Sequence, residues 1–296
     1  MNTSTPQTVE DRVIERLAEP RRNRHFRRLF MSFFIRLLSV SICLLFWQAA
    51  SVERWKIIVN FQNVPAPTAV AEAGVRLVQS SKLLDHVLSS VKRIFAGFGL
   101  AALLAVTLGL FAGRSRLIAD IFMSPLEVLR PIPAVAWIPL AILMFVSPEG
   151  SMIFITFIGA FFPILLSTIH GVARIDRRLI FAAMTLGASP VAVFREVILP
   201  GALPAIVTGL SIGMGTSWFS LVTAETISGQ YGIGYYTWEA YTLQNYPDIV
   251  LGMISIGLLG MLTRYLLESA YPNSVAIIRT SFPAVCSSAS IWPACL

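Results

Sequence analysis

Charged residues are scarce in this chain. Only 13% of its 296 residues are Asp, Glu, Lys or Arg, about half of the roughly 25% that is usual in soluble domains. Hydrophobic residues make up 55% of the sequence, and the mean hydropathy is +0.71. This composition excludes an ordinary soluble domain and indicates an integral membrane protein. Because a membrane-spanning helix needs ~20 apolar residues, the length suits one all-α domain of about six spans.

Cysteine and histidine are rare, and their spacing excludes the common disulfide and metal sites. The cysteines are Cys43, Cys286 and Cys295. The histidines are His25, His86 and His170. No CxxC pair and no Cys/His ligand spacing occurs. Since a membrane-embedded enzyme needs clustered His, Asp or Glu on facing helices, that class is the weakest alternative. We predict no metal site and no catalytic residue.

The sequence also lacks any Gly-Lys dipeptide. A Walker A loop requires that dipeptide, because its lysine reaches the nucleotide phosphates. The chain therefore cannot form such a loop itself. If its work is driven by ATP, another subunit must hydrolyse the nucleotide.

Basic residues give a net charge of +7, but they border apolar runs. The most basic cluster directly precedes the first apolar run and contains Arg21, Arg22, Arg24, Arg27 and Arg28. This arrangement is typical of a membrane topology signal, because Lys and Arg favour the cytoplasmic side. We predict a cytoplasmic basic segment over residues 1–28 and no nucleic-acid partner.

Six apolar runs are long enough to span or nearly span a bilayer. They cover Leu29–Ala50, Ile94–Phe111, Ile132–Val146, Ser151–His170, Ala202–Val222 and Ile249–Leu267. The third run opens with Pro131 and Pro133 and contains Pro139. Proline removes a backbone donor and clashes with the preceding turn. A bent or broken helix is therefore predicted there, a feature that often lines a pathway.

The distribution of basic residues predicts that both termini are cytoplasmic. With six spans, the N-terminal segment, Arg114–Arg116, Arg174–Arg195 and Arg264 fall on one side. The opposite loop 224–248 contains no Lys or Arg, as expected outside. The outer loop 51–93 fits less well, because it holds Arg54, Lys56, Arg76, Lys82, Lys92 and Arg93. Long loops follow the rule only weakly.

The cytoplasmic stretch between the fourth and fifth spans predicts two short helices. The first, Arg178–Leu186, stops at Gly187, which can adopt the left-handed cap conformation. Ser189 can cap a second helix that starts at Pro190. We expect that helix to end at Pro200, since Leu199 is disfavoured in the α region before proline. The hairpin could dock in a groove of another protein, with Phe194 and Ile198 as apolar anchors. It could equally rest on the lipid surface.

This hairpin resembles the EAA loop of binding-protein-dependent ABC transporter permeases. The matching stretches are Phe181-Ala-Ala-Met-Thr-Leu-Gly187 and Val197-Ile-Leu-Pro200. The family pattern is Glu-Ala-Ala, three residues, Gly and a later Ile-x-Leu-Pro, and the loop is the coupling helix that docks on the ATPase. The resemblance assigns coupling roles to seven residues: Phe181, Ala182, Ala183, Gly187, Phe194, Leu199 and Pro200. Phe181 replaces the family glutamate, so docking is expected through shape and apolar contact.

Two further motifs resemble the nitrate, sulfonate, taurine and bicarbonate permease branch. They are Arg130-Pro-Ile-Pro-Ala-Val-Ala-Trp-Ile-Pro139 and Glu225-Thr-Ile-Ser-Gly-Gln-Tyr-Gly-Ile-Gly234. The resemblance covers about residues 30–270 and implies a type I ABC importer permease in the cell (inner) membrane. It also implies a second copy of the chain, separate ATPase subunits that hold ATP and Mg²⁺, and an extracytoplasmic binding protein that delivers a small anion.

This reading predicts a six-span permease domain over residues 29–270 with its coupling loop at 178–201. The tail 271–296 has no assigned role. Polar or amphipathic residues near the spans are candidates for the translocation pathway: Arg130, Trp137, Trp218, Ser220 and Glu225. Arg130 and Glu225 could instead snorkel or form a structural ion pair. Two alternatives stay open, a permease for another small solute (a compatible solute, an amino acid or a pyrimidine precursor) and a secondary carrier without an ATPase.

Overall fold

The computed structural model describes residues 21–54, 61–79, 82–228 and 231–281. Every regular element within these ranges is a helix. The chain forms two compact units, residues 1–71 and 72–296. The predicted all-α membrane fold is confirmed.

The first unit contains one long helix, α2 (Arg21–Val52). Its stretch Phe33–Val52 is long and apolar enough to cross a membrane. A 3₁₀ turn, η1 (Phe61–Asn63), and the beginning of α3 (Pro67–Gln79) follow. The amide of Gln48 binds Thr68 through two hydrogen bonds of 3.4 Å and so ties the end of α2 to the start of α3.

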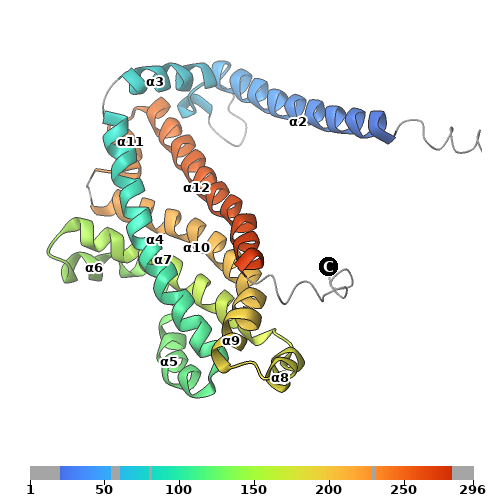
Figure 1. Ribbon diagram of the computed structural model, residues 1–296. Coiled ribbons are helices and arrows are strands. Elements are labelled where there is room, and N and C mark those ends of the chain that lie inside the picture. Colours follow the sequence, from blue (N-terminus) through green and yellow to red (C-terminus); the bar gives the residue numbers. More distant parts are fainter. Residues whose placement is uncertain (1–20, 55–60, 80–81, 229–230, 282–296) are drawn as a thin grey trace, which may run out of the picture. The chain divides into compact units, whose positions relative to one another are not determined.

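The second unit is built on three long helices that pack side by side. These are α4 (Lys82–Arg114), α7 (Pro148–Ala173) and α10 (Leu199–Ser228), with α7 packing against both others (Figure 1). Glycines allow the close approach, since lipid supplies no hydrophobic drive between helices. A Cβ at Gly97 or Gly109 would lie 2.7 Å from a threonine of α7, and one at Gly159 would lie 2.5 Å from Ser220 of α10.

The third predicted span, Ile132–Val146, contains only the 3₁₀ turn η2 (Ala134–Trp137) and the short helix α6 (Ile138–Met144). These are the second half of a broken helix whose first half, α5 (Arg116–Leu129), was not predicted. The two halves meet at an angle of 83°. Ile138 and Ala141 of α6 enter the core beside α7. Five helices can therefore span a membrane, or six when this pair counts as one span.

Short helices connect α7 to α10 and α10 to the last span. Between α7 and α10 lie α8 (Arg177–Thr185), α9 (Pro190–Val193) and one π-helical turn, η3 (Phe194–Ile198). Beyond α10 come α11 (Ile233–Thr242) and α12 (Tyr246–Ser281). Figure 1 places α8 and α9 at the opposite end of the three long helices from α11.

Several helices extend beyond their predicted bounds, α4 and α12 by the most. Helix α4 begins at Lys82 rather than near Ile94, so Lys92 and Arg93 lie in a helix and not in the outer loop. Helix α12 continues through Ser281, and the first part of the predicted tail is therefore helical. Residues 21–28 of the predicted basic segment 1–28 belong to α2, whereas residues 1–20 and the tail beyond Ser281 lie outside the described residues.

Candidate functional site

The hairpin between α7 and α10 has the predicted glycine corner. Asp176 caps α8 by accepting a hydrogen bond from the backbone N–H of Arg178 at 2.8 Å. Gly187 ends the helix with φ +85°, a left-handed conformation that favours glycine. The N–H of Ala188 donates to the carbonyl of Ala183 at 3.0 Å, which closes the last turn.

The second half of the hairpin begins as predicted but does not end at Pro200. Ser189 is in extended conformation and its hydroxyl accepts from the N–H of Ala192 at 3.2 Å, with Pro190 in the first helical turn. Leu199 is α-helical, at φ −62° and ψ −48°, and its N–H donates to the carbonyl of Phe194. The predicted break is therefore wrong. The π turn absorbs the proline by widening the hydrogen-bond spacing just before it, and α10 continues directly from the hairpin.

The hairpin exposes five large apolar side chains. Their exposed fractions are Leu179 59%, Phe181 63%, Met184 44%, Leu186 88% and Val191 65%. Ala182 and Gly187 are also exposed, whereas Ala183, Phe194, Leu199 and Pro200 are half-buried. Ile198 is only 2% exposed and packs with Val172, Ala202 and Ile206. The prediction that Ile198 is available as an anchor is therefore wrong, because this side chain fixes the hairpin to its own bundle.

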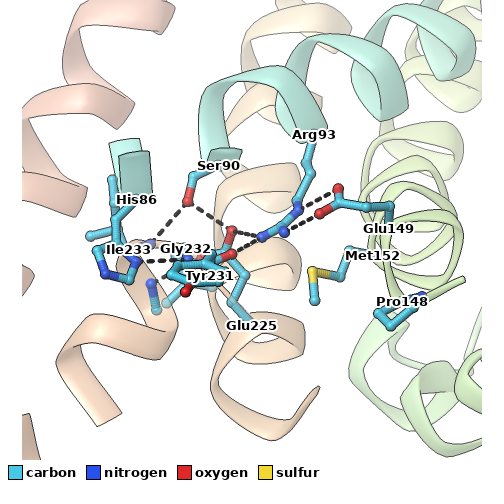
Figure 2. A network of polar contacts seen from close by, with 12 residues as sticks. His86, Ser90, Arg93, Pro148, Glu149, Met152, Glu225, Tyr231, Gly232 and Ile233 are labelled. Carbon is cyan, nitrogen blue, oxygen red and sulfur yellow. Dashed lines mark hydrogen bonds and ion pairs between the residues drawn. The ribbon is translucent and has the colours of Figure 1, made fainter. Parts of the chain in front are cut away.

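The other end of the three long helices holds a buried ion-pair network centred on Arg93 of α4 (Figure 2). The guanidinium is 2% exposed. Its Nε donates to Glu149 Oε2 at 2.8 Å and its Nη2 to Glu149 Oε1, a bidentate pair with the first turn of α7. Its Nη1 donates to Glu225 Oε1 of α10 at 2.9 Å and to the Tyr231 carbonyl. One arginine thus joins α4, α7, α10 and the segment before α11.

The carboxylate of Glu225 also caps α11. Its Oε2 accepts from the N–H of Gly234 at 3.0 Å, and its Oε1 accepts from the Ser90 hydroxyl at 2.7 Å. The Ser90 oxygen accepts from the N–H of Ile233 at 3.0 Å, and His86 Nδ1 accepts from that of Gly232 at 3.0 Å (Figure 2). Three successive backbone donors at the start of α11 therefore find side-chain acceptors from α4 and α10, which a helix N-terminus requires.

The glycines of this segment leave room for that carboxylate. A Cβ on Gly232 would lie 2.2 Å from Cδ of Glu225. A Cβ on Gly234 would lie 2.4 Å from the carbonyl oxygen of Val222. The Glu225–Gly234 motif is therefore explained by packing around one buried carboxylate.

The five predicted pathway residues do not gather at one place. Glu225 is fully buried in the network, so the structural ion pair is the arrangement observed for it. The buried Trp218 donates its indole N–H to the Thr263 hydroxyl of α12 at 2.9 Å, and the Ser220 hydroxyl donates to the carbonyl of Thr216. Arg130 is exposed at the end of α5, and Trp137 is half-buried in η2. Contact of any of these residues with a transported solute stays a prediction.

Helix α5 exposes two carboxylates that the sequence reasoning did not consider. Asp120 and Glu127 are both exposed, and Ser124 lies between them. Each charged group facing lipid at mid-bilayer costs about 2.5–3.5 kcal/mol on insertion scales. The two groups therefore need water or another chain beside them if α5 lies within the membrane.

Sequence reasoning also missed Arg93, Ser90, His86 and Glu149. Arg93 had been counted as an outer-loop charge that fitted the topology rule poorly. Its pairing with two glutamates accounts for one of the six basic residues in that loop, since ionisable groups within a membrane usually pair with one another. The spacing of His86, Ser90 and Arg93 on one helix face was the available signal.

Known proteins resemble this chain over about 70% of its length. A family model described as binding-protein-dependent transport system inner membrane component matches residues 105–278. A putative ABC transporter permease protein of Methanocaldococcus jannaschii is 38% identical over 222 residues, 72% of this chain and 83% of the relative. The putative aliphatic sulfonates transport permease protein SsuC of Escherichia coli is 38% identical over 216 residues, 73% and 81% of the two chains. The nitrate import permease protein NrtB of Synechocystis is 32% identical over 219 residues, 70% and 80%. The chain therefore belongs to the family of binding-protein-dependent transport system inner membrane components and is a multi-pass permease subunit of an ABC transporter.

Proposed function

We propose that this permease imports a small oxyanion, such as nitrate, a sulfonate or taurine, with energy from ATP hydrolysed by separate subunits. The names of the relatives support this substrate class, because they include a nitrate import permease and an aliphatic sulfonates transport permease. The absence of a Gly-Lys dipeptide supports the division of labour. ATP and Mg²⁺ then belong to the partner ATPase.

The ATPase docks on the hairpin of α8, α9 and η3. The observation that carries this assignment is the apolar surface of Leu179, Phe181, Met184 and Leu186, exposed beside a corner fixed by Gly187. Such a surface is suited to a groove of a partner protein. Because Phe181 stands where the family pattern has a carboxylate, the contact between the hairpin and the ATPase is apolar at this position. Ala182, Ala183, Phe194, Leu199 and Pro200 keep their coupling roles as part of this proposal.

The hairpin end faces the cytoplasm. Arg114, Arg174, Arg177, Arg178 and Arg195 all lie at this end or on the hairpin. The end that holds the Arg93 network and α11 then faces outward, as the scarcity of Lys and Arg in residues 224–248 indicates. Both termini are cytoplasmic in this orientation, and the solute-binding protein delivers the anion at the outer end.

Transport proceeds by alternating access in a complex with a second copy of the chain. Closure of the ATPases moves the hairpins, and α10 carries this movement from η3 toward the outer end because the helix is continuous. The bundle then opens outward while the binding protein releases its anion. Opening of the ATPases returns it to the inward-facing state.

Reconstitution in liposomes tests this function. The permease, the ATPase encoded beside it and the corresponding binding protein are combined, and uptake of labelled nitrate, taurine and glycine betaine is compared. We expect ATP-dependent uptake of an oxyanion and none without the ATPase. Uptake of glycine betaine alone would identify the alternative solute class, and uptake driven by an ion gradient without the ATPase would identify a secondary carrier.

A further inference from the structure

His86 of α4 lies at the start of α11, where one of its ring nitrogens takes part in a hydrogen bond. Nδ1 accepts from the backbone N–H of Gly232 at 3.0 Å (Figure 2). The side chain is 6% exposed and packs beside the rings of Tyr231, Tyr235 and Tyr236, whose centroids lie 5.6, 6.3 and 5.8 Å away. Because Nδ1 accepts this hydrogen bond, it carries no hydrogen of its own, and the imidazole is the neutral form protonated on Nε2.

The cap of α11 therefore contains one acceptor that a proton can convert into a donor near neutral pH. The other two acceptors, the Ser90 hydroxyl and the Glu225 carboxylate, bind the next two backbone N–H groups. A hydroxyl does not titrate in this range, whereas an unperturbed imidazole gains its charge between about pH 8 and pH 5. A proton on Nδ1 of His86 would place one donor against another, the N–H of Gly232. The hydrogen bond between them would then be lost.

A positive charge on His86 would also meet positive neighbours. A helix N-terminus carries a partial positive charge, and His86 lies directly beside the N-terminus of α11. The guanidinium of Arg93 lies two turns further along the same face of α4. The carboxylate of Glu225 already accepts from Arg93, from Ser90 and from a backbone N–H. A second cation therefore weakens this arrangement.

Other titratable and charged groups surround His86 or act on the tyrosines that pack against it. An ordinary tyrosine stays neutral up to a pKa near 10, and burial raises the pKa of Tyr236 further. Among the described groups named here, His86 is thus the one whose ordinary titration range lies around neutral pH. Besides Arg93, Glu225 and the three tyrosines, the set comprises Asp85 and Lys92 of α4, Glu149 of α7, and three groups that act on Tyr236, namely Glu239 of α11, Asp248 of α12 and Arg76 of α3.

We propose that His86 makes the permease sensitive to the pH of the outer medium, because its protonation releases the first turn of α11 and slows uptake. This inference rests on the proposed function, in which α11 faces outward and the anion is delivered there. The cluster lies at the surface of the chain, since Tyr231 next to His86 is 67% exposed. The proton comes from the outer medium and returns to it when the pH rises.

Uptake with the two sides buffered separately tests this proposal. The transporter is reconstituted in proteoliposomes with excess binding protein, and the ATPase side is held at about pH 7.5 while the other side is lowered to about pH 5.5. We expect wild-type uptake to fall about threefold to tenfold, the effect of one lost hydrogen bond.

Two variants separate His86 from the rest of the transporter. His86→Asn keeps an acceptor at the position of Nδ1 that does not titrate, so its uptake should fall less than about twofold over the same range. Dividing the two profiles removes the pH dependence of the binding protein. His170→Asn, at the exposed end of α7, is the matched control and should follow the wild type. An identical profile for His86→Asn and wild type would overturn the inference, and so would a response to the pH of the ATPase side alone.

His86→Phe provides a second check, because it keeps an aromatic ring among the tyrosines but has no acceptor. Its uptake should resemble that of the acidified wild type at every pH. Uptake by His86→Phe that equals neutral wild type would show that the hydrogen bond to Gly232 does not matter for transport, and would reject the proposal.

The protonation of His86 can be measured without any transport. Histidine labelled with ¹³C at Cε1 is incorporated into the H25Q/H170Q permease in nanodiscs, and its resonance is followed by nuclear magnetic resonance. We expect the resonance to titrate, and the amides of Gly232 and Ile233 to exchange hydrogen faster in acid after correction for the intrinsic pH dependence of exchange. A resonance that stays neutral down to about pH 5 would reject the inference. Absence of ATP-driven uptake at every pH would instead contradict the proposed function, and this measurement would still decide whether His86 titrates.

Discussion

The guanidinium of Arg93 and the carboxylate of Glu225 are 2.9 Å apart, and both side chains are almost completely buried. They come from α4 and from the last turn of α10, 132 positions apart in the sequence. Glu149, which shares the same guanidinium, is 61% exposed. Loss of the Arg93–Glu225 pair should therefore destabilise the fold more than loss of the Arg93–Glu149 pair.

Substitution of Arg93 should destabilise the permease strongly. Arg93→Gln leaves the carboxylate of Glu225 buried without its cation, a change that typically costs about 3–5 kcal/mol. Glu149→Gln should cost less than about 1 kcal/mol, since that carboxylate is largely in water. Thermal unfolding in detergent measures both. The double variant R93Q/E225Q should recover part of the loss, and failure to recover any would show that packing and not charge dominates.

Replacement of Gly232 by alanine should disrupt the same network by sterics. The added Cβ would lie 2.2 Å from the Glu225 carboxylate, which is itself held by Ser90 and Gly234. Gly215→Ala is the matched control, because no atom lies within 4 Å of a Cβ there. We expect lower thermal stability and lower membrane levels for the first variant only. Similar thermal stability of Gly232→Ala and Gly215→Ala would mean that the backbone between α10 and α11 can shift enough to accommodate the added Cβ.

The Gly187 corner should be required for coupling but not for insertion. Gly187→Pro cannot adopt φ +85° and removes the N–H that donates to the Met184 carbonyl. We expect loss of permease-stimulated ATP hydrolysis with normal membrane levels. Gly187→Ala should lose less, since a left-handed alanine costs about 1–2 kcal/mol. Full stimulation by the proline variant would exclude docking through this hairpin.

Phe181 should contribute binding energy to the ATPase rather than to the fold. Its side chain is 63% exposed, so Phe181→Ala should weaken ATPase binding by about 1–3 kcal/mol while thermal stability of the isolated permease is unchanged. Phe219 on α10 is the matched control, at 67% exposed and far along the chain from the hairpin. Binding is measured by titration of the ATPase onto the permease in nanodiscs. Equal affinity of the wild type and Phe181→Ala for the ATPase would refute an apolar contact through Phe181.

Trp218 distinguishes a packing role from a pathway role. Its indole N–H bonds to Thr263 at 2.9 Å and links α10 to α12. If the bond is structural, Trp218→Phe and Thr263→Val each lower the stability by about 1 kcal/mol. Their effects should also be non-additive in a double-mutant cycle. A change in the half-saturating anion concentration without a change in stability would instead support contact with the solute.

Local signals in the sequence were sufficient for the hairpin but not for the ion-pair network. The predicted roles were a helix cap, a first-turn proline and a left-handed corner, and each depends only on neighbouring residues in the sequence. All three were confirmed, at Ser189, Pro190 and Gly187. The helix end at Pro200 was predicted wrongly because a helix can either break before a proline or continue through a π turn. Here the chain forms the π turn, and Ile198 within it packs in the core. Tertiary context decides between them.

The network depends on contacts that no local pattern contains. Arg93 and Glu225 meet only after α4, α7 and α10 have packed, so Arg93 was read as a loop charge and Glu225 as a pathway candidate. The glycines that allow this packing were recognised as small residues in spans, but their partners on neighbouring helices could not be deduced. Composition, by contrast, was enough for the membrane class. The prolines indicated the bend at the third span, but the first half of that span, α5, was not predicted.

The π turn at Phe194–Ile198 has a mechanical consequence. Because the chain stays helical through Leu199, residues 190–228 form one uninterrupted rod of 39 residues. At 1.5 Å per residue it is about 58 Å long, nearly twice the ~30 Å of a bilayer's hydrocarbon core. Ile198 lies near one end and Glu225 near the other, both buried in their own bundle. Because this segment is helical from the hairpin to Glu225, the hairpin and the ion-pair network of Arg93 are two ends of one continuous element and not separate elements joined by a loop.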